Sequence, residues 1–261
     1  MSRISILGCG WLGLPLGEQL ISHGFHVNGS TTTSNKLKII ERTGIKPYFI
    51  DLSPDFKGDI SFFNCDILII NIPPRNSETD DQYHEKQLLS IRNQVISKKV
   101  SKVIFISSTA VYPNTNGVVC ESDADESNLS RGGVPLLKME KLFANEDAFE
   151  TTVIRFGGLY GPDRHPGRFL AGKEGLKGAD NPINMIHRDD CIAIIEQVIE
   201  NNLWNDTFNA VAPSKQTRKE FYVNAAEELG MEAPSFGEEP QPFKSVSSSH
   251  LLEKLQYSFI H

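Results

Sequence analysis

The feature that most constrains the fold is a glycine-rich turn near the N-terminus, Gly8-Cys9-Gly10-Trp11-Leu12-Gly13. It directly follows the apolar run Ile4–Leu7 and opens a helical pattern over Leu12–His23. Glycines at this spacing permit a tight turn, close approach of the backbone to a pyrophosphate, and close packing of helix on strand. The helix N-terminus adds free N–H groups and the positive end of its dipole. The turn therefore predicts a dinucleotide site, with contacts from Gly8, Gly10, Trp11, Leu12 and Gly13.

Short apolar runs alternate with longer amphipathic segments, the pattern of a parallel sheet covered by helices. The expected strands are Ile4–Leu7, His26–Ser30, Tyr48–Ile50, Ile67–Asn71, Val103–Ser107, Thr152–Phe156 and Ile183–Ile186. The expected helices are Leu12–His23, Ser34–Thr43, Asp80–Lys99, Val134–Ala148, Asp189–Asn201 and Ser214–Leu229. The crossovers between parallel strands should be right-handed.

Composition changes after Gly161. Residues 161–182 are rich in Gly and Pro, and residues 231–247 are rich in Pro, Ser and Glu. We therefore expect a nucleotide-binding domain over residues 1–160, continued by 183–210. The segments 161–182 and 211–261 should form a smaller substrate-binding lobe.

Charge and cysteine content exclude several classes of protein. The 261 residues carry 26 Lys and Arg against 33 Asp and Glu, a net charge of −7, with no long basic run. A general nucleic-acid binder would carry a basic surface. The four cysteines are far apart and form no CxxC pair, so the sequence predicts neither a disulfide framework nor a metal site. Without a signal-peptide pattern or a membrane-length apolar run, we expect a cytoplasmic protein with no membrane partner.

The end of the second strand indicates which dinucleotide binds. NAD-specific sites usually place a carboxylate about 20 residues past the glycine turn, to bind the ribose 2′-hydroxyl. Here the sequence continues through Ser30, Thr31, Thr32 and Lys36 without an acidic residue. Hydroxyls and a lysine suit a 2′-phosphate, so NADP(H) is favoured over NAD(H). In the alternative interpretation these hydroxyls cap the next helix.

Two further strand ends lie on the same expected edge of the sheet. Asp51 and Leu52 end the third strand, where the carboxylate would accept the adenine amino group or would only stabilise a turn before Pro54. Asn71, Ile72 and Pro73 end the fourth strand, at the carboxyl edge where open α/β sheets bind ligands.

A second motif, Val103-Ile104-Phe105-Ile106-Ser107-Ser108-Thr109-Ala110-Val111-Tyr112, is an apolar strand that ends in hydroxyls and a Val-Tyr pair. Together with the glycine turn, it resembles the extended short-chain dehydrogenase/reductase superfamily of the NAD-dependent epimerase/dehydratase type. Further segments match that family in order: Ile154–Phe156, Gly158–Pro162, Asn184–Asp190, Thr207–Ala210 and Ser249–Tyr257. Gly10–Leu16 and Gly161–Phe169 narrow the resemblance to bacterial proteins labelled nucleoside-diphosphate-sugar epimerases.

The resemblance implies a Rossmann-type doubly wound α/β fold, with about seven parallel strands and a small C-terminal substrate lobe. It also implies that Ser107 lies at the cofactor and that Ser108 binds the substrate oxygen. The alternative role for Ser108 is local backbone bonding at the strand end. Relatives often dimerise through the helices matched by Asp80–Lys99 and Val134–Ala148, so a homodimer is expected.

One family feature is absent. The family's proton donor is a Tyr in YxxxK, whereas aligning Lys138 with that lysine places Val134 at the tyrosine. The preferred register, set by Glu140-Lys141-Leu142, places Gly132 at the tyrosine and Leu136 at the lysine. Neither valine nor glycine transfers protons. The remaining donor candidates are Tyr112, Tyr160, His165 and His187, of which we select Tyr112 together with Ser108 as catalytic.

Arg164, His165 and Arg168 form a local basic group in an otherwise acidic chain. Arginine forks suit phosphate or carboxylate ligands, so these residues are expected to bind a small anionic substrate. The alternative is a solvated loop that neutralises nearby acids.

Two hypotheses follow. The first is an NADP(H)-dependent oxidoreductase or epimerase acting on a small polar or sugar-nucleotide-like substrate through a non-standard proton donor. The second is a non-catalytic NADP(H)-binding sensor. A β-hydroxyacid dehydrogenase of the 6-phosphogluconate type would explain the glycine turn, but not the segments Ser107–Tyr112 and His187–Asp190.

Overall fold

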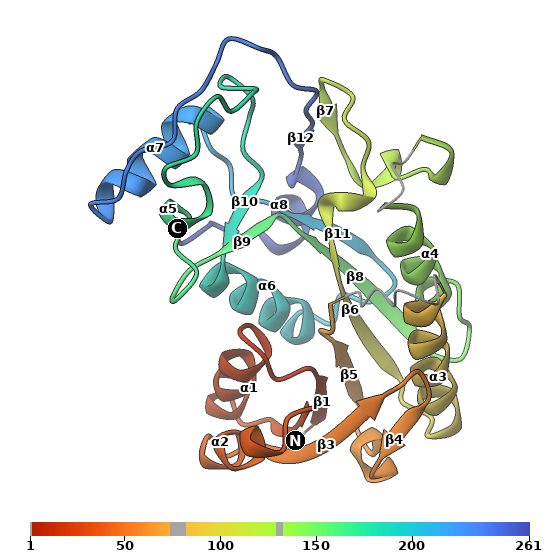
Figure 1. The fold of residues 1–261 in the computed structure, drawn as a ribbon. Coiled ribbons are helices and arrows are strands. Elements are labelled where there is room, and N and C mark those ends of the chain that lie inside the picture. The colour runs from red at the N-terminus through yellow and green to blue at the C-terminus, as the bar shows by residue number, and fades with distance from the viewer. Residues whose placement is uncertain (1, 74–81, 129–132) are drawn as a thin grey trace. The chain divides into compact units, whose positions relative to one another are not determined.

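The computed structural model describes residues 2–73, 82–128 and 133–261. Its central feature is an eight-stranded sheet in the order β11-β8-β6-β5-β1-β2-β3-β4 (Figure 1). The strands are β1 Arg3–Leu7, β2 His26–Thr31, β3 Lys46–Leu52, β4 Phe56–Gly58, β5 Ile67–Ile70, β6 Lys102–Ser108, β8 Glu150–Phe156 and β11 Thr207–Ala210. The neighbours of β1 are parallel, and β4 pairs antiparallel with β3. The predicted doubly wound Rossmann-type α/β fold is confirmed.

Helices cover both faces of this sheet. Figure 1 shows α1 (Gly13–Ser22) and α2 (Leu37–Arg42) on one face, and α3 (Tyr83–Ser97) and α4 (Gly133–Ala144) on the other. On the second face, Leu88 and Ile91 of α3 and Phe143 of α4 are fully buried with strand residues in one apolar core. Because helices bury both faces of the sheet, a central strand such as β5 has apolar side chains on both of its faces. Among the described residues, no helix is long and apolar enough to span a bilayer.

The chain divides into two compact units. The first comprises residues 1–107, 134–154 and 195–207, and the second comprises residues 108–133, 155–194 and 208–261. The two segments expected to form the substrate lobe, 161–182 and 211–261, both fall within the second unit. That unit also contains α5 (Gly167–Leu170), α7 (Arg218–Glu228) and α8 (Ser249–Leu255). The helix α6 (Arg188–Glu200) contributes residues to both units.

Several elements differ from the sequence expectation. The last predicted strand is β10 (Met185–His187), which pairs with β9 (Gly158–Tyr160) in a separate two-stranded sheet rather than in the central one. The chain departs from β8 at Gly157, where an added Cβ would meet the Asn184 carbonyl oxygen at 2.7 Å.

The predicted helix from Ser34 begins as a 3₁₀ turn, Ser34–Lys36. The predicted start of the third helix, at Asp80, lies outside the described residues. A further two-stranded sheet joins β7 (Val118–Val119) and β12 (Ser245–Val246).

Candidate functional site

The glycine turn links β1 to α1 in the first unit. Gly8 has a φ of +109°, and a Cβ there would lie 2.4 Å from the Asn71 carbonyl oxygen. A Cβ at Gly13 would lie 2.2 Å from the Gly8 carbonyl oxygen, whereas a Cβ at Gly10 would meet nothing within 4 Å. Gly8 and Gly13 are therefore required by the turn itself. Gly10 instead leaves bare backbone facing open space, as close approach of a ligand requires.

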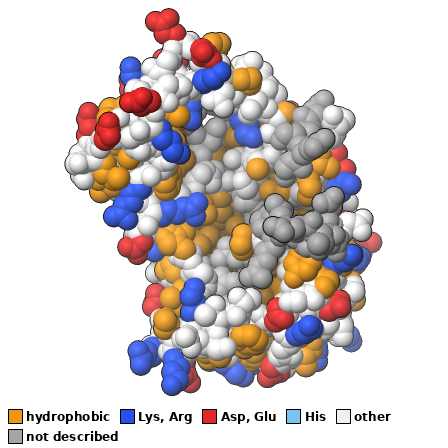
Figure 2. Space-filling model, in the orientation of Figure 1, with side chains coloured by type: hydrophobic (Ala, Val, Ile, Leu, Met, Phe, Trp, Pro, Cys, Tyr) orange, Lys and Arg blue, Asp and Glu red, His pale blue; other side chains and the backbone are white. Residues whose placement is uncertain are grey.

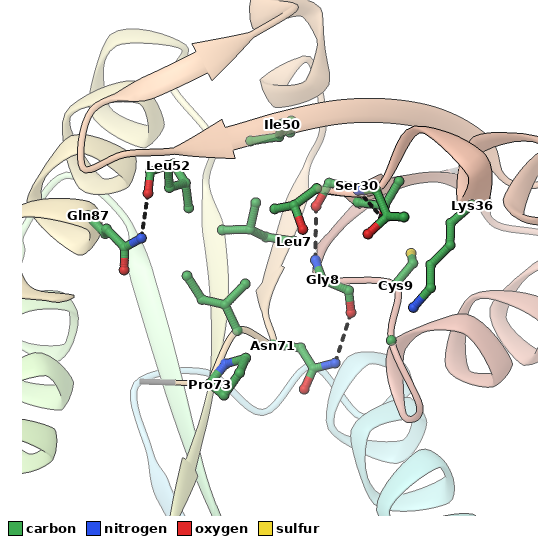
Figure 3. Close-up of a pocket in the computed structure, with 15 residues that line it drawn as sticks. Leu7, Gly8, Cys9, Ser30, Lys36, Ile50, Leu52, Asn71, Pro73 and Gln87 are labelled. Carbon is green, nitrogen blue, oxygen red and sulfur yellow. Dashed lines mark hydrogen bonds between the residues drawn. The ribbon is translucent and has the colours of Figure 1, made fainter. Parts of the chain in front are cut away.

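Beside this turn lies a cavity at the carboxyl ends of β1, β2, β3 and β5, here called the glycine-loop cavity (Figure 3). It is lined by Leu7, Gly8, Cys9, Gly10, Ser30, Thr31, Thr32, Thr33, Lys36, Ile50, Leu52, Asn71, Ile72, Pro73 and Gln87. The structure thus brings ten of the predicted cofactor residues together: Gly8, Gly10, Ser30, Thr31, Thr32, Lys36, Leu52, Asn71, Ile72 and Pro73. The carboxyl edge of a parallel sheet is the usual ligand position in open α/β folds.

Hydrogen bonds from neighbouring strand ends hold the turn in place. The Gly8 N–H donates to Ser30 Oγ at 2.9 Å, and the Cys9 N–H donates to the Ser30 carbonyl at 2.8 Å. The Asn71 side-chain amide donates to the Gly8 carbonyl at 3.1 Å, a bond drawn in Figure 3. Ser30 and Asn71 therefore fix the glycine backbone from both neighbouring strands.

The polar segment after β2 gives the cavity its charge. Lys36 extends past Cys9 toward the glycine turn (Figure 3), and it is the only charged residue among the described residues that line this cavity. Thr31 Oγ1 accepts a bond from the Thr33 N–H at 3.1 Å, and the N-caps of the following 3₁₀ turn and of α2 have no side-chain capping bond. The observed bonds therefore do not support the helix-capping interpretation of these hydroxyls.

The remaining predicted cofactor residues lie outside the lining of the cavity. Asp51 accepts a bond from Ser53 Oγ at 2.6 Å, which is the turn role left open by the sequence. Leu12 and Gly13 are buried and Trp11 is half-buried in the turn. The buried Ser107 hydroxyl donates to the Glu140 carboxylate of α4.

Sequence reasoning missed five lining residues: Leu7, Cys9, Thr33, Ile50 and Gln87. Of these, Gln87 carried a signal, because it is a polar residue beside Leu88 and Ile91 on the buried side of α3. It is 3% exposed and donates to the Leu52 carbonyl at the end of β3. Burial raises the pKa of the Cys9 thiol to about 12, so this thiol stays protonated and unreactive at neutral pH.

Ser108 begins the second unit, at the end of β6. Its Oγ accepts a bond from the Ala110 N–H at 3.2 Å and so caps the 3₁₀ turn Thr109–Val111. This is the local backbone role that the sequence allowed. Ser108 is only partly buried, and its hydroxyl oxygen is the acceptor in this bond.

Tyr112 lies at the centre of a buried network in the second unit. Its hydroxyl donates to Asn209 Oδ1 at 2.7 Å and accepts from Arg155 Nη1 at 2.6 Å. The same guanidinium donates to the Glu121 carbonyl at 3.0 Å. Burial raises the pKa of Tyr112 to about 12, although Arg155 acts in the opposite direction. A phenol that is 3% exposed and bonded on both sides is arranged to join strands rather than to meet a substrate.

The helix expected to carry YxxxK is α4. In one register its tyrosine position is Val134, a half-buried residue, and Lys138 is exposed. In the preferred register the tyrosine position is Gly132, which lies outside the described residues, and the lysine position is the half-buried Leu136. In neither register does the tyrosine position carry a phenol.

The predicted basic group lies around α5 in the second unit. Arg164 and Arg168 are exposed. Two backbone hydrogen bonds between Gly161 and Arg164 close the turn over residues 161–164. His165 Nδ1 accepts from the Gly167 N–H at 3.2 Å, and Nε2 lies 3.5 Å from a Glu228 oxygen. The proximity of His165 and Glu228 fits the alternative of a charge-balancing loop, while both guanidinium groups remain at the surface. On the face seen in Figure 2, basic and acidic side chains lie interspersed.

Comparison with known proteins places these features in context. No family model matches the chain. A conserved protein of unknown function from Silicibacter pomeroyi has a TM-score of 0.80 at 19% identity, covering 100% of this chain and 94% of that one. The UDP-N-acetylglucosamine 4-epimerase of Bacillus cereus has a TM-score of 0.78 at 14% identity, with 100% and 95% covered. MoeE5, solved with UDP-glucose and NAD, has a TM-score of 0.78 at 17% identity, with 99% and 94% covered.

The sheet order, the glycine turn and these likenesses give the chain the fold of the NAD-dependent epimerase/dehydratase class, as the resemblance implied. Protein YeeZ of Escherichia coli K12 is 31% identical over 240 residues, which cover 90% of this chain and 87% of YeeZ. The chain belongs to the YeeZ family.

Proposed function

We propose that the protein is an NADP(H)-dependent oxidoreductase or epimerase that acts on a small, anionic, sugar-nucleotide-like substrate. The observation that carries this proposal is the glycine-loop cavity. It combines a backbone cradle for a pyrophosphate with hydroxyls and one lysine, and the lining residues that the structure describes include no carboxylate. Neighbours of the same fold, such as MoeE5, bind NAD and a UDP-sugar, which supports the cofactor class and the substrate class.

The residues present fit a dinucleotide. Gly10 leaves open space where any side chain would project, and the first turn of α1 offers backbone N–H groups to phosphate oxygens. Trp11, Leu12 and Gly13 belong to the glycine turn that precedes and opens α1, and the exposed Pro73 borders the cavity. When bound, the nicotinamide accepts or supplies a hydride; the protein binds it, orients it and excludes water.

The end of β2 supports a preference for NADP(H). A ribose 2′-hydroxyl is usually held by a carboxylate at this strand end, and a 2′-phosphate by cations and hydroxyls. Here Thr31, Thr32 and Lys36 line the cavity. A phosphate dianion gains charge-assisted hydrogen bonds from such a set, whereas a free 2′-hydroxyl gains little from Lys36.

Residues of the second unit would handle the substrate. Ser108 would donate its hydroxyl proton to the reacting oxygen, and Arg164, His165 and Arg168 would bind the anionic part. The geometry of Tyr112 argues against its assignment as proton donor, because its hydroxyl is buried and bonded to Asn209 and Arg155. We therefore assign Ser108 the substrate oxygen and Tyr112 a structural role.

The second candidate function is a non-catalytic NADP(H)-binding sensor. It is favoured by the lack of a phenol at the tyrosine position of α4 in a chain whose glycine turn is intact. The two functions differ in their sensitivity to Ser108. Turnover by an enzyme requires this hydroxyl, whereas a sensor depends only on residues of the glycine-loop cavity.

Titration with NADPH and with NADH tests the proposal, with quenching of Trp11 fluorescence as the signal and calorimetry as the check. We expect NADPH to bind at least tenfold more tightly than NADH. Binding of neither dinucleotide would refute the proposed cofactor site. If NADPH binds, turnover is then screened with UDP-sugars and carbonyl acids, and turnover that survives Ser108→Ala would remove Ser108 from the mechanism.

Two further proposals complete this assignment. We place the protein in the cytoplasm, where nicotinamide dinucleotides and sugar nucleotides are available. We also propose a homodimer through α3 and α4, which correspond to the expected helices Asp80–Lys99 and Val134–Ala148. Sedimentation equilibrium of the purified chain tests the dimer directly.

A further inference from the structure

A group of potential metal ligands in the second unit takes no part in the proposed function. It consists of His187 at the end of β10, Asp189 in the first turn of α6, and His261, here called the His-Asp-His cluster. One ligand atom from each residue lies within 4.8 Å of the other two. Two of its members, His187 and His261, line a cavity of about 570 Å³, here called the histidine cavity, which Tyr160, His165 and Phe221 also line.

The distances within the cluster approach those of a coordination site. Asp189 Oδ2 lies 3.6 Å from His187 Nδ1 and 3.6 Å from His261 Nε2. In a tetrahedral zinc site with bonds of about 2.0–2.2 Å, neighbouring ligand atoms lie roughly 3.4 Å apart. A cation between these three atoms would therefore need ligand movements of only a few tenths of an ångström along these two edges.

Surrounding groups contact Asp189 and the backbone that carries His261. Arg188 Nε forms an ion pair with the other Asp189 oxygen, Oδ1, at 3.6 Å. The fully buried Asp190 accepts bonds from the Ile260 N–H at 2.7 Å and from the His261 N–H at 3.3 Å, and so fixes the backbone that carries His261. Metal sites typically depend on such supporting contacts.

The two imidazole rings of the cluster lie against each other, with their ring centroids 3.8 Å apart. The Asp189 N–H donates to His187 Nδ1 at 3.2 Å, which assigns the lone pair of the neutral ring to Nδ1, the atom closest to Asp189. A bound cation would replace this long hydrogen bond.

We propose that His187 Nδ1, Asp189 Oδ2 and His261 Nε2 bind a divalent transition-metal ion, with Zn²⁺ as the best chemical match. Two imidazoles and a carboxylate suit zinc, and three protein ligands leave a fourth position for water or an anionic ligand. The Asp189 and His261 side chains are 45% and 41% exposed, so an ion can enter without unfolding. This inference is independent of the dinucleotide proposal.

Zinc binding to the tag-free, chelator-treated protein tests the proposal by calorimetry with ZnCl₂ and by metal analysis after dialysis. We expect one Zn²⁺ per chain. His261→Ala and Asp189→Asn should each weaken binding at least tenfold, because each removes one of three ligands.

Two matched histidine variants locate the ion. His165→Ala removes a histidine from the same cavity, and His23→Ala removes one from a second group with Glu196 and Glu200 in the first unit. Both variants should bind Zn²⁺ as the unaltered protein does. The proposal is overturned if no Zn²⁺ binds, if His261→Ala binds normally, or if His23→Ala abolishes binding.

Cobalt substitution provides a readout that does not depend on affinity. Co²⁺ in a four-coordinate nitrogen and oxygen site should give a visible absorption band that is absent from His261→Ala. Thermal unfolding of that variant without metal should match the unaltered protein, which separates ligand loss from misfolding. A cobalt spectrum unchanged by His261→Ala would place the ion elsewhere.

Discussion

The glycine-loop cavity and the region around Ser108 differ in how they are built. The first depends on backbone conformation: Gly8 and Gly13 have no room for a side chain, and Gly10 faces open space that a ligand can fill. The second depends on individual side chains. Ser108 is present, whereas the tyrosine that the family places on the helix matched by α4 is absent. Replacing one side chain can leave the fold unchanged, whereas altering the glycine backbone conformation changes the fold itself. A site built from backbone can therefore persist in a protein in which the reactive side chains have changed.

The largest effect that would test this contrast is expected at Gly8. Gly8→Ala places a Cβ against the Asn71 carbonyl at positive φ, which should lower the free energy of unfolding by about 3 kcal/mol. Gly10→Ala, whose Cβ meets nothing within 4 Å, should change that free energy by less than about 1 kcal/mol. It should nevertheless weaken NADPH binding, because its Cβ occupies ligand space. Urea unfolding and NADPH titration of both variants measure this difference, and equal stability of the two would contradict it.

Lys36 should set the choice between dinucleotides. Lys36→Glu replaces the cation in the glycine-loop cavity with an anion, so NADPH affinity should fall about a hundredfold and NADH affinity by less than about threefold. Lys38→Glu is the matched control, because Lys38 is an exposed lysine two residues further along the chain, in α2, and does not line the cavity. An equal loss for both dinucleotides would show that Lys36 does not contact a 2′-phosphate.

Ser108 and Ser107 should respond in opposite ways. Ser108→Ala should reduce kcat at least tenfold and leave NADPH affinity unchanged, since the hydroxyl would act only on the substrate oxygen. Ser107→Ala removes the donor to the buried Glu140 carboxylate, so it should cost about 1–3 kcal/mol of stability. Steady-state kinetics and thermal unfolding separate the two effects. A stability loss at Ser108 with normal turnover would reverse this assignment.

The smallest effect is expected at Tyr112. Tyr112→Phe should change kcat by less than about threefold and reduce stability by about 1–2 kcal/mol, because Asn209 and Arg155 lose a partner. The raised pKa of Tyr112, about 12, means that the unfolded chain loses this proton first as the pH rises from about 10. Stability should therefore fall between about pH 10 and 12, and less steeply in the variant. A kcat that collapses in Tyr112→Phe would restore this residue as the proton donor.

Sequence reasoning succeeded where local pattern determines structure. The glycine turn, the second strand and the order of strands and helices follow from short-range patterns, because glycine spacing and apolar periodicity act over a few residues. It failed where distant segments meet. The last predicted strand, β10, was correctly assigned as a strand, but its pairing with β9 depends on the departure of the chain at Gly157.

The side-chain clusters were the least predictable part. Gln87 reaches the Leu52 carbonyl only because α3 packs beside the end of β3, and His261 meets His187 only because Asp190 holds residues 260 and 261. Neither contact is recognisable in the sequence, because each joins residues that are far apart along the chain. At Asp51 the sequence allowed two roles, an adenine contact or a turn role, and the observed bond from the nearby Ser53 is the turn role.

One edge of the central sheet is formed by β4, a three-residue antiparallel strand that contains Lys57. A long, flat, apolar edge strand would offer unpaired backbone groups to the strands of other molecules. So short a strand presents few such groups, and a lysine there disfavours the apolar stacking that strand exchange requires. The antiparallel addition to an otherwise parallel arrangement thus protects this edge against aggregation.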